Sequence, residues 1–197
     1  MWTASKIRRF VFQLPKGQMF ASMELVHMGP RYMIDSTTSN MVKAGIILRL
    51  ANGVFVRNDH GLKLPSREEV AAYKAKIFAK RIFVHGSEAA AKLRLKKSDS
   101  TKTIFAINGS SSSYVCLGKR IYFHGLSPRK VALADSPIGL VIRALWHLKK
   151  GIAHEDVVKA TRVLNHRQKE ELRAQARFMP GWLIAHFPWG NPDSIAA

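Results

Sequence analysis

Residues 41–58 read MVKAGIILRLANGVFVRN, and this stretch decides the expected fold of the N-terminal part. IILRL and VFVRN are rich in apolar and β-branched residues, and Ala51-Asn52-Gly53 separates them. Asn-Gly between two apolar runs is a strong sequence signal for a β-hairpin. The stretch therefore predicts a hairpin that directly follows a helix ended by Gly45.

Three helical segments are expected before this hairpin. In residues 3–14, apolar side chains recur at i, i+3, i+4 and i+7, which predicts an amphipathic helix. A short second helix is expected over 22–28, and a third over 30–44. Three helices followed by a hairpin predict a winged helix-turn-helix domain over residues 1–61.

The expected outer face of the third helix consists mainly of short or forked hydrogen-bonding side chains. Such groups can reach base edges in a major groove, whereas an ordinary solvated helix favours Glu and Lys. The alternative is a solvated face on a protein-interaction domain. We expect Arg31, Ser36, Ser39 and Asn40 nearest the bases, and Tyr32 and Lys43 nearer the backbone. Basic and turn residues around them complete the predicted DNA-binding set: Lys6, Arg8, Arg9, Arg49, Asn52 and Arg57.

The charge of the chain favours a polyanionic partner. Its 197 residues include 32 Lys and Arg against 13 Asp and Glu, a formal net charge of +19. The excess is spread along the chain, with +5 in residues 1–61, +9 in 62–125 and +5 in 126–197. We therefore expect double-stranded DNA as the partner, at an operator with inverted repeats, and further nucleic-acid contacts from the C-terminal part.

The sequence disfavours membrane proteins and secreted proteins. No apolar stretch approaches the roughly 18 residues of a membrane span, and the first residues lack a signal-peptide pattern. A single cysteine, Cys116, forms no intramolecular disulfide, and its alternating apolar context predicts a buried strand residue. We expect a cytoplasmic protein without a membrane partner.

The sequence also disfavours catalysis and bound metal. Acidic residues are sparse, and most occur as adjacent pairs that would diverge on a helix. His85-Gly86-Ser87 and His124-Gly125 each end an expected strand, but cysteine or carboxylate companions are missing. We therefore expect no catalytic residues, no metal site and no cofactor, and we interpret Ser87 as a helix N-cap.

Residues 66–197 are expected to form a second domain after a short linker. Ser66 would cap a helix, followed by a strand, an Ala-rich helix and three β-type runs between residues 102 and 124. Helices are expected from Ser127 onward. The predicted fold class is α+β, with an N-terminal winged helix-turn-helix and a mixed α/β C-terminal domain that has a small antiparallel sheet and C-terminal helices.

Four motifs of this second domain occur in a specific order. They are HGSEAAAKLRL, KTIFAINGSSSSYVCLGKRIYFHGLSPRKVALA, PIGLVIRALWHLKKG and RFMPGWL. In this order they resemble the C-terminal domain of AbiEi-type antitoxins, and with MVKAGIILRLANGVFVRN the resemblance covers nearly the whole chain.

The resemblance implies a bacterial antitoxin of a type IV toxin-antitoxin system. Such a protein represses its own operon and antagonises a nucleotidyltransferase-like toxin, without necessarily forming a stable complex with it. The Lys-rich segment 92–102 and the tail FPWGNPDSIAA depart from the family pattern. A stand-alone regulator of a mobile element and an RNA-binding protein therefore stay open as alternatives. Basic residues near expected helix ends form the candidate antitoxin surface: Lys92, Arg94, Lys96, Lys97, Arg129 and Lys130.

Overall fold

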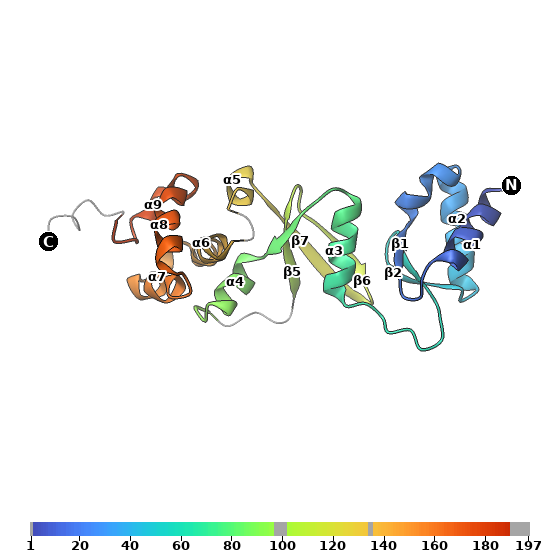
Figure 1. Cartoon of the computed structure of the whole chain (residues 1–197), viewed down its shortest axis with the longest axis horizontal. Coiled ribbons are helices and arrows are strands. Elements are labelled where there is room, and N and C mark those ends of the chain that lie inside the picture. The colour runs from blue at the N-terminus through green and yellow to red at the C-terminus, as the bar shows by residue number, and fades with distance from the viewer. Residues whose placement is uncertain (1, 97–101, 134–135, 190–197) are drawn as a thin grey trace. The chain divides into compact units, whose positions relative to one another are not determined.

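The structure is a computed structural model that describes residues 2–96, 102–133 and 136–189 (Figure 1). Backbone contacts divide the chain into two compact units. Unit 1 contains residues 1–81 and 113–121, and unit 2 contains residues 82–112 and 122–197. Unit 1 therefore extends beyond the module expected over residues 1–61 and includes a segment that is distant in the sequence.

The N-terminal part of unit 1 has three helical segments and a hairpin, in the order that the sequence predicts. An additional short strand precedes the second helical segment. The elements are α1 (Thr3–Gln13), β1 (Met19–Ala21), the 3-10 helix η1 (Ser22–Met28), α2 (Arg31–Lys43), β2 (Ile47–Ala51) and β3 (Val54–Arg57).

Apolar side chains spaced at helical intervals bury one face of each helix in this part. Ile7 and Val11 of α1 are fully buried, as is Ile34 of α2. Burial of such side chains contributes about 1.5 to 3 kcal/mol each to folding. Because these residues fix the inner faces of α1 and α2, the polar residues on the opposite faces, such as Arg8 and Ser36, lie on the surface.

The rest of unit 1 holds the hairpin turn in place. Helix α3 (Arg67–Ile77) begins at Ser66, whose hydroxyl accepts a hydrogen bond from the Glu69 backbone N–H, as expected for an N-cap. From α3, the Lys74 ammonium donates to the carbonyl of Asn52 at 2.7 Å. The Tyr73 hydroxyl donates to the Glu24 carboxylate at 2.5 Å, and burial together with this carboxylate raises the pKa of Tyr73.

Unit 2 is built around helix α6 (Pro137–Leu148). Val141, Ile142 and Leu145 of α6 are fully buried, and α4 (Gly86–Lys92) packs against them through Ala89 and Ala90. The small alanine side chains let the two helices approach closely. Other elements of this unit are β4 (Ile82–Val84), β5 (Thr103–Asn108), α5 (Pro128–Val131), η2 (Lys149–Gly151), α7 (His154–Thr161), α8 (His166–Ala174), η3 (Gln175–Phe178) and α9 (Gly181–Ile184).

The sheet corrects the predicted fold class. The fold is α+β, but the expected small antiparallel sheet is wrong, because one mixed sheet of seven strands has the order β1-β3-β2-β6-β7-β5-β4. Its remaining strands are β6 (Ser112–Cys116) and β7 (Lys119–Leu126). β2 of the hairpin pairs with β6 at Ala51 and Cys116, and Cys116 is buried as predicted. Periodicity reveals individual strands but not which edges pair, so the sequence did not predict this connection.

Within the described residues, no helix has both the length and the apolar character that crossing a membrane requires.

Candidate nucleic-acid interface and histidine pocket

The outer face of α2 presents the polar side chains that the sequence singles out for base contacts. Arg31, Ser36, Asn40 and Lys43 are exposed, Ser39 is half-buried, and Tyr32 is 73% exposed. Arg31 donates through Nε to both carboxylate oxygens of Asp35, at 3.0 and 3.1 Å. Both side chains are more than half exposed, so this pair adds little to stability and the guanidinium stays accessible to a ligand.

Arg49 connects this face with the hairpin. Its Nη2 lies 3.4 Å from the Ser39 hydroxyl oxygen, at the C-terminal half of α2. The guanidinium carbon also lies 5.5 Å from the centre of the Phe55 ring, which holds the side chain against β3. The exposed side of α2 and Arg49 of β2 therefore belong to one continuous surface. We call this surface the α2 face, and its residues are Arg31, Tyr32, Ser36, Ser39, Asn40, Lys43 and Arg49.

Arg57 has different surroundings from Arg49, although both were predicted to contact DNA. Its side chain is only 16% exposed, and Nε donates to the Asp59 carboxylate at 2.8 Å. Nη1 donates to the carbonyl of Phe12 at 2.8 Å. Arg57 therefore ties α1 to β3, and Asp59 neutralises its charge.

The other predicted DNA-binding residues lie on α1 and at the hairpin turn. Lys6, Arg8 and Arg9 are exposed on α1, because Ile7 and its neighbours face the core. The Asn52 side chain is exposed at the hairpin turn, but the Lys74 hydrogen bond to its carbonyl anchors this turn to α3.

The candidate antitoxin residues divide into two groups. Lys92, Arg94 and Lys96 are exposed at and after the end of α4, where Lys92 pairs with Glu88 at 3.0 Å. On α5, the guanidinium carbon of Arg129 and the Nζ of Lys130 lie 5.8 and 4.5 Å from the centre of the Trp146 ring. The Arg129 guanidinium also donates to the carbonyl of Met179. Lys97 lies outside the described residues.

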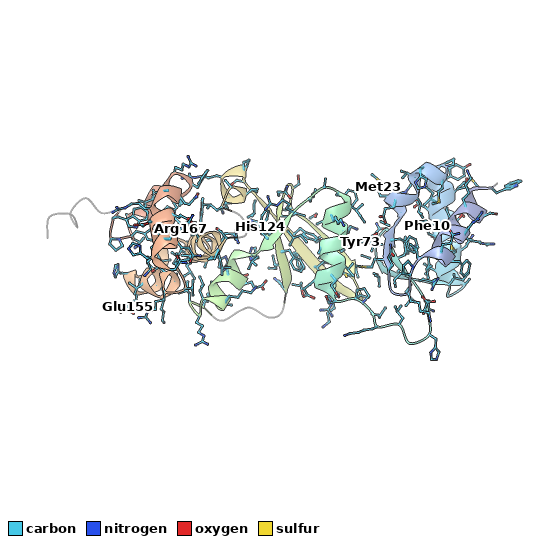
Figure 2. All side chains as sticks on the ribbon, in the orientation of Figure 1. Phe10, Met23, Tyr73, His124, Glu155 and Arg167 are labelled. Atoms are coloured by element: carbon cyan, nitrogen blue, oxygen red, sulfur yellow. The ribbon has the colours of Figure 1, made fainter. Side chains whose placement is uncertain are left out.

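Three histidines from three different elements meet in unit 2. His85 follows β4, His124 lies on β7, where Figure 2 labels it, and His147 lies in the last turn of α6. The His85 ring centre lies 5.5 Å from that of His124 and 5.6 Å from that of His147. They line a cleft of about 190 Å³, the histidine pocket, whose other polar lining consists of Lys130, Arg143 and Lys149.

Glycines next to the histidines make this convergence possible. A Cβ atom on Gly86 would lie 2.7 Å from the Cβ of His147 and 3.0 Å from the carbonyl oxygen of Arg143. A Cβ atom on Gly125 would lie 2.2 Å from the carbonyl oxygen of Gly109. All three distances are shorter than van der Waals contact, so side chains larger than hydrogen would push these segments apart.

His85 also corrects the predicted cap of α4. The N-cap is His85 rather than Ser87: its Nδ1 accepts a hydrogen bond from the Ser87 backbone N–H at 3.3 Å. The Ser87 hydroxyl lies 2.7 Å from the same nitrogen. Because Nδ1 is an acceptor here, a neutral His85 ring carries its proton on Nε2.

The pocket is electropositive. Burial, followed by the nearby His147 and His124, lowers the pKa of His85 to about 4. Burial, followed by Lys96 and Lys149, lowers the pKa of His147, and burial lowers the pKa of Lys130. No carboxylate lines the pocket among the residues that the structure describes. The lowered pKa values keep His85 and His147 mostly neutral near pH 7, and lysine and arginine side chains surround these rings.

The sequence did not predict this pocket. The sequence predicts that His85-Gly86 and His124-Gly125 end strands, but β7 continues beyond His124 to Leu126, and nothing in the local pattern around His147 indicates the same place. In the described ranges of the chain, no three His, Cys, Asp or Glu side chains are grouped to hold a metal ion.

Fold and surface together define an α+β protein with an exposed polar helix face in one compact unit and a cationic pocket in the other. A family model matches residues 6–172, so the chain belongs to DUF6088, a family of unknown function. The comparisons with curated proteins and with solved structures found no match.

Proposed function

We propose that this protein is a DNA-binding transcriptional regulator that reads duplex DNA with the α2 face. The observation that carries the proposal is the contact between Arg49 and Ser39. The Arg49 Nη2 on the hairpin lies 3.4 Å from the Ser39 hydroxyl oxygen on α2, a helix rich in hydrogen-bonding side chains. A helix inserted into the major groove with a strand cation beside it can contact bases and phosphates at the same time.

The chemistry of the α2 face suits base recognition. Asn40 carries an amide that can bond bidentately to adenine, and Arg31 carries a guanidinium that can bond bidentately to guanine. Asp35 is the one acidic residue in the sequence of α2. Unit 1 as a whole has 16 Lys and Arg against 5 Asp and Glu, a net charge of +11, which favours association with a polyanion.

A finer proposal rests on the resemblance to AbiEi-type antitoxins. In it, the protein represses its own operon through unit 1 and antagonises a nucleotidyltransferase-like toxin through basic residues of unit 2. Lys92, Arg94 and Lys96 support this assignment, since all three side chains are exposed at and after the end of α4, where Lys92 pairs with Glu88. The family match itself carries no information on toxins.

Binding to defined DNA tests the first proposal. The full-length protein is titrated against duplex from its own upstream region, random duplex and single-stranded RNA at one salt concentration. Asn40→Ala should cost about 1 to 3 kcal/mol on the upstream duplex and much less on random duplex. Gln18→Ala removes another exposed amide, outside α2, and serves as the matched control.

Equal losses for Asn40→Ala on both duplexes would contradict base reading by α2. Preference for single-stranded RNA over the upstream duplex would favour the RNA-binding alternative instead.

Growth rescue tests the finer proposal. Lys96→Glu in the full-length protein should abolish rescue from a co-encoded toxin and leave operator binding within about twofold, because Lys96 lies outside unit 1. Lys169→Glu, on exposed α8, is the matched control. Intact rescue with weakened DNA binding would make the basic residues of unit 2 an accessory DNA contact.

A further inference from the structure

The geometry of unit 2 points to a second binding site, and we propose that the histidine pocket binds the dianion of a phosphate group. The ligand is inorganic phosphate or the terminal phosphate of a phosphorylated molecule such as a nucleotide. This site involves none of the residues of the α2 face, so it stands independently of the proposed DNA binding.

The donors that meet in the pocket match a tetrahedral oxyanion. A neutral imidazole offers one N–H, and the N-cap contact of His85 leaves its Nε2 as the donor. His124 and His147 add a ring each, and the Lys130 ammonium adds three N–H groups. A carboxylate has only two oxygens for so many donors, whereas a phosphate monoester has three terminal oxygens.

The arrangement is held by the fold rather than by flexible surface side chains. The Arg143 side chain is only 5% exposed, and its Nη1 lies 3.4 Å from the carbonyl of Leu133, which follows α5. This contact fixes the segment that carries Lys130 next to α6. The Lys130 Nζ also lies 4.5 Å from the centre of the Trp146 ring, so the ammonium is positioned before a ligand arrives.

The size of the pocket limits what enters it. Sites for drug-sized molecules usually measure about 300 to 1,000 Å³. At about 190 Å³, this pocket accommodates a phosphate group, and a sugar or base attached to that phosphate would extend outside.

The electrostatics of the histidine pocket favour an anion. The charged and titratable groups that act on His85 come from every element around it: His124 of β7, His147 of α6, Glu88 of α4 and Lys130 of α5. Lys96 and Lys149 act on His147 as well. All of these except Glu88 disfavour a further positive charge. A bound dianion reverses this effect, so binding should raise the pKa values of His85 and His147.

A metal ion is the competing occupant of any histidine cluster. Zinc ligands must reach one point at about 2.0 to 2.1 Å from each nitrogen. The described residues hold no group of three such side chains placed for this, and the Lys130 and Arg143 charges would repel a cation.

Calorimetric titration of the full-length protein tests the proposal. The probes are inorganic phosphate, adenosine 5′-monophosphate, adenosine and a trinucleotide with or without a 5′-phosphate, all in chloride buffer. Inorganic phosphate and the phosphorylated probes should bind, and the two probes without phosphate should not. Similar affinities for phosphate and the monophosphate would place only the phosphate in the pocket, whereas tighter binding of the monophosphate would add contacts outside it.

Variants connect this binding to the pocket. The double variant His124→Gln with His147→Gln replaces two exposed rings, so the fold should persist. In this double variant, phosphate binding should be at least tenfold weaker than in the wild type. His154→Gln, at the exposed start of α7, should change it by less than twofold. NMR of the histidine rings should show the pKa of His147 rising when phosphate is added.

Equal affinity of the wild type and the double variant for phosphate would overturn the proposal, as would equal binding of adenosine and its monophosphate. Micromolar Zn²⁺ binding that the double variant loses would identify a metal site and would also overturn it.

Discussion

The α2 face and the histidine pocket both carry polar chemistry, but they arise in opposite ways. The α2 face is convex and exposed, and apart from Arg49 its residues come from a single helix. The histidine pocket is concave, and His85, His124 and His147 reach it from separate elements. On the convex surface, side chains are exposed to a partner, whereas in the pocket burial lowers the pKa values of His85 and His147 before any partner binds.

This difference explains why one arginine of the hairpin belongs to the exposed α2 face and the other does not. Arg49 and Arg57 look equivalent in the sequence, since both follow apolar residues on neighbouring strands. The structure gives Arg49 an exposed position beside α2, whereas Arg57 lies between Asp59 and the end of α1. Exposure and available partners, rather than residue type, decide which cation can bind DNA.

The substitution with the largest expected effect disrupts the close packing of α6 against the segment that ends at Leu133. A Cβ atom on Gly139 would lie 1.6 Å from the carbonyl oxygen of Leu133, so Gly139→Ala requires the backbone to move. We expect a loss of about 3 kcal/mol or more in the free energy of unfolding, although Ala is normally the better helix former. Urea unfolding measures this loss.

Gly151→Ala is the control, because nothing lies within 4 Å of its added Cβ atom. It should change the free energy of unfolding by no more than about 0.5 kcal/mol. If both variants were equally stable, the close approach of α6 to the segment ending at Leu133 would be wrong.

A second prediction compares the free energy of unfolding of the alanine variants of Arg57 and Arg49. Arg57→Ala leaves the half-buried Asp59 carboxylate and the Phe12 carbonyl without their donor, so it should lower the free energy of unfolding by about 2 kcal/mol. Arg49→Ala should change it by less than about 0.5 kcal/mol, because that side chain is exposed. Thermal or urea unfolding of both variants measures the difference, and equal losses would remove the distinction drawn here.

The pocket makes stability depend on pH in a predictable direction. The pKa of His85 is about 4 in the folded chain and near 6.5 when unfolded, so the unfolded state binds the proton first as the pH falls. Stability should therefore decrease from pH 7 to pH 4.5. For a half-buried ring, screened by solvent, we expect about 1 to 2 kcal/mol from this group.

His85→Asn isolates this contribution, because Asn is a good N-cap that does not titrate. Urea unfolding in phosphate-free buffer should show a smaller decrease for His85→Asn than for the wild type. Parallel decreases in the two proteins would mean that His85 does not keep its lowered pKa.

The smallest predicted effect concerns the α2 face. Arg49→Ala should weaken binding to operator and random duplex alike. It should also reduce the slope of log binding constant against log salt concentration by about one unit, which corresponds to one lost phosphate contact. Lys76→Ala, an exposed cation on α3, should leave the salt dependence unchanged. An unchanged salt dependence for Arg49→Ala would exclude this residue from the DNA contact.

Local elements were predictable from the sequence wherever one segment carried its own signal. Asn52-Gly53 indicated the hairpin, the spacing of Ile7 and Val11 indicated α1, and Ser66 indicated the start of α3. The outer face of α2 followed from the same periodicity, because burial of Ile34 and its neighbours determines which side is exposed.

The sheet and the pocket could not be predicted in this way. Both depend on segments that are distant in the sequence, such as Ala51 with Cys116 or His85 with His147. Single-sequence patterns carry no information on such pairings. The glycine after His85 offered a faint signal, because a strand end followed by glycine permits close approach of another element.

Lysine acetylation footprinting, read by mass spectrometry on the full-length protein, tests most directly the claim that two separate surfaces bind two different ligands. Operator duplex should protect Lys43 on the α2 face and leave the reactivity of Lys130 unchanged. Inorganic phosphate should protect Lys130 in the histidine pocket and leave Lys43 unchanged. Protection of Lys130 by duplex DNA, with Lys43 still fully reactive, would contradict the account.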